Sequence, residues 1–80
     1  GGFTNNDDYR RIGKSFDKTI IALRITIKKL ATIIEKVEDN WLVYDMMMQH
    51  KHMLHHQVDL LIKQKAKYKR NFLYIQSITQ

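Results

Sequence analysis

Four histidines within seven residues are the densest group of potential metal ligands in this 80-residue chain: His50, His52, His55 and His56. His52 and His56 are four residues apart and would share one face of a helix, a spacing that allows two imidazoles to bind one Zn²⁺. A closed zinc site needs four ligands, which antiparallel pairing with a second chain at this point would supply. The segment lacks the acidic or cysteine partners that make motifs such as H-E-x-x-H specific. We therefore predict no metal site and keep His52 and His56 as weak candidates. Because histidine titrates near ~6.5, a pH-sensitive contact is the other interpretation.

The segment from Lys63 to Arg70 is the strongest basic patch of a chain whose net charge is +6. Lys63, Lys67 and Arg70 would share one helical face and attract the phosphates of nucleic acid or anionic lipid, with Tyr68 and Phe72 stacking or inserting beside them. The alternative is that Tyr68 and Phe72 belong to a core, and that the lysines form a solvated face complementing the acidic middle of the chain. We favour this alternative.

No catalytic constellation is present in the sequence. It has no glycine-rich phosphate loop, no nucleophile with a neighbouring base, no isolated carboxylate pair and no cysteine. We therefore expect neither an enzyme nor a bound cofactor. No stretch approaches the ~20 apolar residues of a membrane span, and no signal peptide is visible, so a cytoplasmic or nuclear location is the expectation.

The elements that would position these residues are helices, because apolar residues recur alternately three and four apart along most of the chain. An average spacing of 3.5 residues is typical of helices that pack along their whole length. We predict that these residues form the interface. The first series is Phe16, Ile20, Leu23, Ile27, Leu30, Ile34, Val37, Trp41, Tyr44 and Met48; the second is Leu54, Val58, Leu61, Tyr68, Phe72 and Ile75, with Lys65 as its one polar position.

The two series are out of register, which places a register break or turn in residues 49–57. We predict a disordered or capping lead-in at 1–8, with an expression-tag remnant at Gly1-Gly2, a first helical segment at 9–48 and a second at 58–80, in one domain or fragment. Glu38-Asp39-Asn40 is the other possible turn, since Asn40 is able to cap a helix that starts at Trp41. We prefer 49–57, because the heptad phase passes from Val37 to Trp41 without slipping.

The predicted fold is all-α: a long coiled-coil-type helix or a long helical hairpin that self-associates. An 80-residue chain without disulfides has little core of its own. Isoleucine and leucine at alternating positions favour parallel pairs. Opposite charges favour antiparallel ones, which would lay Lys63–Arg70 beside Glu35–Asp45 about a centre near His52–His56. We favour the antiparallel arrangement. Additional isoleucines outside the first series widen the stripe and suit a helical bundle.

The expected function is structural: an oligomerisation or scaffolding module, homodimeric or bundled, within a larger protein. Its partner would be itself and possibly another helical protein. The rival interpretation is a basic helical module that binds an anionic membrane surface or nucleic acid through Lys63–Arg70.

Overall fold

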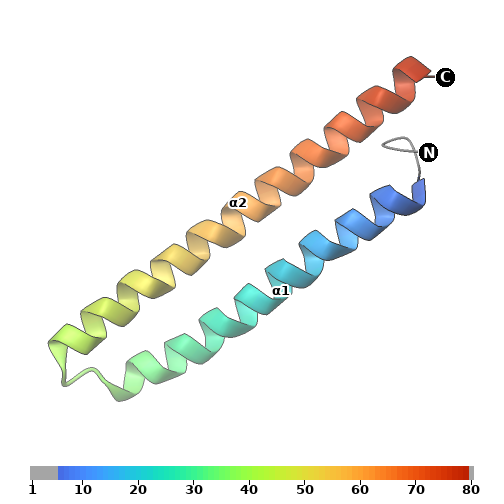
Figure 1. Cartoon of the computed structure of the whole chain (residues 1–80). Coiled ribbons are helices and arrows are strands. Elements are labelled where there is room, and N and C mark those ends of the chain that lie inside the picture. Colours follow the sequence, from blue (N-terminus) through green and yellow to red (C-terminus); the bar gives the residue numbers. More distant parts are fainter. Residues whose placement is uncertain (1–5, 80) are drawn as a thin grey trace.

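Two long antiparallel helices form a hairpin (Figure 1). The computed structural model describes residues 6–79. Helix α1 comprises Asn6–Lys36 and helix α2 comprises Trp41–Thr79, and residues 37–40 connect them. The hairpin measures 61 × 16 × 13 Å, and α1 begins at the end of the hairpin where α2 finishes (Figure 1). The all-α class and the helical-hairpin form of the prediction are therefore confirmed.

Helix α1 begins earlier than the sequence pattern indicated. Asn6, Asp7 and Asp8 are helical, whereas the prediction assigned them to a lead-in; the rest of that lead-in lies outside the described residues. Asp7 and Asp8 occupy the first turn and Lys36 the last. These charges are favourable at their respective ends, because the helix dipole is positive at the start and negative at the finish.

The turn between the helices lies at residues 37–40, and residues 49–57 are continuous helix within α2. Placing a turn at 49–57 was therefore wrong, and so was a single helical segment over 9–48. The Val37 amide donates to the carbonyl of Ile34 (3.2 Å), which ends α1. The side-chain oxygen of Asn40 accepts a hydrogen bond from the Val43 amide (3.2 Å). Asn40 is thus the N-cap of α2, because it satisfies an amide that the helix itself leaves unpaired.

The hydrophobic core is the seam between the two helices. Six buried side chains form one cluster, and Leu23, Met47, Met48 and Leu61 pack around it. The cluster consists of Ile20, Ile27, Leu30, Ile34, Leu54 and Val58. The apolar stripe of α1 is therefore covered by the second half of the same chain. The core is thin, since no described side chain is completely enclosed.

Aromatic rings fill the seam near the open end of the hairpin. Tyr9 stacks on Phe72 with 4.1 Å between ring centroids, and on Tyr68 with 5.6 Å. Phe16 lies 6.3 Å from Tyr68 in a tilted arrangement. Phe72 is buried and Tyr68 is half-buried. These two rings thus belong to the interior of the hairpin, where aromatic pairs add to the stabilisation that burial provides.

Candidate helical interface

Most of the predicted interface residues lie in the seam of the hairpin. Fourteen of the sixteen are buried or half-buried: Phe16, Ile20, Leu23, Ile27, Leu30, Ile34, Val37, Met48, Leu54, Val58, Leu61, Tyr68, Phe72 and Ile75. Trp41 and Tyr44 are exceptions and are exposed, Trp41 to 76%. The reason is the turn at 37–40: it separates them from α1, so they do not continue the stripe of that helix.

Two seam residues of α2 escaped the sequence pattern. Val43 and Met47 are half-buried, and Met47 packs against the core cluster. With α2 starting at Trp41, Val43, Met47 and Leu54 are spaced four and seven residues apart and share one face. The capping residue Asn40 was the available signal, because restarting the helical phase there selects this face.

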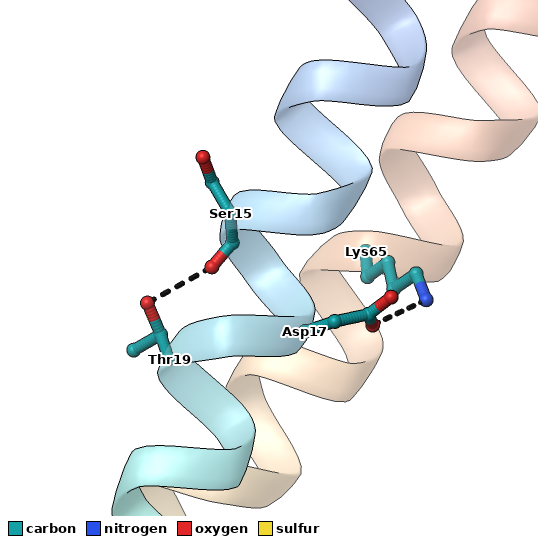
Figure 2. Close-up of polar contacts among 4 residues, drawn as sticks. All are labelled: Ser15, Asp17, Thr19 and Lys65. Atoms are coloured by element: carbon teal, nitrogen blue, oxygen red, sulfur yellow. Dashed lines mark hydrogen bonds and ion pairs between the residues drawn. The ribbon is translucent and has the colours of Figure 1, made fainter.

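The polar position of the second series is paired across the seam. The Lys65 ammonium donates to Asp17 Oδ1 at 2.6 Å, and the two side chains meet between α1 and α2 (Figure 2). Both groups remain partly exposed, so the pair contributes about 0.2–1 kcal/mol. The contact also shows that, within one chain, Lys65 lies beside the first half of α1. An antiparallel arrangement that lays Lys63–Arg70 beside Glu35–Asp45 is therefore wrong for the two helices of one chain, and between two chains it stays a prediction.

The candidate anion-binding residues Lys63, Lys67 and Arg70 are exposed on α2. By helical periodicity they point away from the seam. Tyr68 and Phe72 point into it, so the lysines and the aromatic rings do not share a face. Within residues 6–79, neither helix is long and apolar enough to cross a membrane.

The four histidines are all exposed, and by helical periodicity His50 and His55 point to other sides of α2 than His52 and His56 do. His52 and His56 lie one turn apart on its outer surface, as the spacing predicted. Across the described residues, no three His, Asp or Glu side chains come together in a way that could hold a metal ion. A zinc site would therefore need ligands from a second chain.

By helical periodicity, one long side of the hairpin carries few charged side chains within the described residues; we call it the uncharged face. Shallow grooves between the helices lie on this side, where Ser15, Thr19 and Leu23 of α1 meet Leu60 and Leu61 of α2. Lys29 and Lys67 lie at its margins, Asp8 continues the α1 row one turn before Ile12, and His50 lies on the α2 row between Met46 and Met53. By helical periodicity, the α1 row of the face is Ile12, Ser15, Thr19, Ala22, Thr26, Leu30 and Ile33, and the α2 row is Leu42, Met46, Gln49, Met53, Gln57, Leu60, Gln64, Tyr68, Asn71, Ile75 and Ile78.

The threonine hydroxyls on the uncharged face are bonded within α1. Thr19 donates to the carbonyl of Ser15 at 3.0 Å (Figure 2), and Thr26 donates to the carbonyl of Ala22 at 2.9 Å. Ser15 and Thr19 lie on the opposite edge of α1 from Asp17 (Figure 2). Because these hydroxyls already have acceptors, covering this row leaves them satisfied.

The opposite side of the hairpin is charged. It carries the Asp17–Lys65 pair and, by helical periodicity, Arg24, Lys28 and Lys69. The two sides thus differ in kind, one apolar and amide-rich, the other dominated by ionised groups.

No protein-family model, curated protein or solved structure matches this chain. The surfaces of the hairpin are therefore the basis on which a function is proposed.

Proposed function

We propose that the chain is a self-associating structural module, in which two hairpins pack through their uncharged faces into a four-helix bundle. The function of such a module is oligomerisation or scaffolding, and its partner is a second copy of itself. The observation that carries the proposal is the scarcity of charged side chains along one side of the described hairpin, in a chain with a net charge of +6.

Covering the uncharged face has a low desolvation cost and a favourable apolar contribution. Met46, Met53 and Leu60 of α2, and Ile33 of α1, are exposed there. Burying apolar area contributes roughly 25 cal/mol per Å², whereas burying an unpaired charge costs far more. Small residues at Ser15, Thr19 and Ala22 allow a second helix to approach closely, because interaxial distance depends on the side chains at the contact.

The exposed area of the hairpin also supports a partner. The chain exposes 6495 Å², against about 5,100 Å² for a compact monomer of its mass of 9.6 kDa. The excess is of the order of 1,400 Å². A stable interface removes about 600–1,000 Å² from each partner. A second hairpin on the uncharged face would therefore remove about 40–70% of this excess.

The distribution of charge favours an antiparallel arrangement of the two hairpins. Residues 60–80, at the open end, carry five basic residues and no acid, whereas residues 35–45, around the turn, carry four acids and one lysine. Two hairpins in opposite directions keep the two basic segments apart and bring each of them closer to the acidic turn of the other. Parallel hairpins would place the two basic ends together. Each exposed pair contributes little, but several together select an orientation.

A matched pair of variants tests the proposal. Leu60 and Ile62 are almost equally exposed, at 44% and 42%, but lie on the uncharged and the charged side of α2 respectively. We expect Leu60→Glu to dissociate the dimer, because the carboxylate would enter the middle of the interface. Ile62→Glu changes net charge equally and should leave the dimer intact. Mass by sedimentation equilibrium and helicity by circular dichroism report the outcome. Equal dimerisation of both variants would contradict the proposal.

A further inference from the structure

A row of basic and apolar side chains runs along α1 on the side opposite the seam. At its centre Ile21 and Ile25 are 57% and 48% exposed. Lys14 and Lys18 precede them, and Lys28 and Lys29 follow. All six are spaced three or four residues apart or are direct neighbours, so they lie on one helical surface, and all are exposed. We call this surface the outer row.

The two exposed isoleucines of the outer row, Ile21 and Ile25, contact neither the other helix of the hairpin nor the second chain of the proposed dimer. The seam is formed by the other side of α1, where Ile20 and Ile27 are buried. The uncharged face lies on the flank that carries Thr19 and Thr26. By helical periodicity Ile21 and Ile25 point away from both. They are therefore accessible in the single hairpin and in the proposed pair.

We propose that the outer row binds the surface of an anionic phospholipid membrane. The four lysines supply charge complementarity to lipid phosphates and carboxylates, and no acidic residue occurs between Lys18 and Lys29. Ile21 and Ile25 enter the boundary between headgroups and acyl chains. A basic helix that carries apolar side chains at its centre binds a membrane in this way, lying parallel to the surface.

The N-terminal end of the outer row adds a site for a headgroup phosphate. Arg10, Arg11, Lys14 and Lys18 surround a shallow polar depression whose other lining residues are Asp7 and Ser15. Arg11 is paired with Asp8 at 2.9 Å, and the remaining cations contribute positive potential. Phosphates are attracted to such a cluster by charge and by hydrogen bonds from the cationic side chains.

Lipid fits the outer row better than nucleic acid does. Nucleic acid would engage the lysines through phosphates but leave the isoleucines without an apolar partner, because the row offers neither aromatic rings for stacking nor amides for reading bases. Lipid uses both kinds of side chain. The two partners are therefore distinguished by whether the isoleucines contribute to binding.

Co-sedimentation with vesicles tests the proposal on the intact chain. The probes are vesicles of phosphatidylcholine alone and vesicles of phosphatidylcholine with phosphatidylserine. We expect binding only with phosphatidylserine, weakened by salt. Lys14→Gln with Lys18→Gln should lower affinity at least about tenfold, since each cation near the surface contributes about 1 kcal/mol. Ile21→Ser with Ile25→Ser should lower it by a similar factor.

Two control variants match these changes elsewhere on the hairpin. Lys63→Gln with Lys67→Gln removes the same charge at the same spacing from α2, and Ile62→Ser with Leu73→Ser removes exposed apolar side chains from α2. Both should bind vesicles like the unmodified chain, and circular dichroism should show equal helicity throughout. Equal binding to vesicles with and without phosphatidylserine would overturn the proposal, and so would an equal loss of affinity in the control variants. It would also be overturned if the chain bound an oligonucleotide but no vesicles, and if that binding remained after Ile21 and Ile25 were replaced.

Discussion

Replacing Ile27 with Asp is expected to abolish the folded hairpin. Ile27 lies in the middle of the core cluster with 8% of its surface exposed. The change removes the burial of an isoleucine, which contributes roughly 1.5–3 kcal/mol, and encloses a carboxylate with no cation opposite it in the cluster. A combined loss above about 4 kcal/mol is comparable with the whole stability of a chain of this size, which is of the order of 4–12 kcal/mol.

The matched control for this prediction is Ile25→Asp, two residues away. Ile25 points away from the seam, so the same substitution there exposes the new carboxylate to water. Thermal unfolding followed by circular dichroism at 222 nm measures both variants. We expect cooperative unfolding of Ile25→Asp and no folded baseline for Ile27→Asp. If Ile27→Asp unfolds like Ile25→Asp, the assigned seam is wrong.

Cysteines at Gln49 and Asn71 are expected to link two chains. Asp17 faces Lys65 and Tyr9 faces Phe72 within one hairpin, so the middle of the uncharged face lies near residues 22 and 60. Antiparallel pairing about that middle places α2 of one chain over α2 of the other, with Gln49 beside Asn71. Within one chain these positions are roughly 33 Å apart along the axis, at ~1.5 Å per residue. A disulfide needs Cα atoms within about 7 Å, so only an intermolecular bond forms.

Cysteines at Lys51 and Leu73 provide the control, because this pair has the same sequence spacing but lies on the charged side. Mild oxidation followed by non-reducing electrophoresis should give dimers for Gln49→Cys with Asn71→Cys and monomers for Lys51→Cys with Leu73→Cys. Equal dimer yields for both pairs would contradict the assigned face. A chain that is dimeric by mass but forms no Gln49–Asn71 bond would contradict the antiparallel orientation.

The sequence was sufficient to predict the helical content and most of the seam residues. A helix that is buried against the other half of its own chain has apolar residues three and four positions apart, as does a helix buried against a second chain. The sequence pattern did not locate the turn. The heptad phase runs without a slip from Val37 to Trp41, because the four-residue turn has the same length as one step of the pattern. The phase alone therefore does not reveal that the chain reverses direction there. The capping chemistry of Asn40 was the better indicator, since it accounts for unpaired amides at the start of α2.

The surfaces were harder to predict than the seam. The lysines of the outer row are sparser than the basic run at Lys63–Arg70, because Ile21 and Ile25 separate them, so charge density along the sequence does not reveal the row. The uncharged face was not apparent either, because its two rows come from different halves of the chain. Only the antiparallel packing of α1 on α2 brings Thr19 beside Leu61.

The mass of the unmodified chain in solution tests the central claim, self-association through the uncharged face, most directly. Sedimentation equilibrium across a range of protein concentrations should give twice the chain mass of 9.6 kDa, falling towards the monomer mass on dilution as a dimer requires. The accompanying circular dichroism should show a helical protein at every concentration. A helical chain that remains at the monomer mass throughout the range would contradict the account.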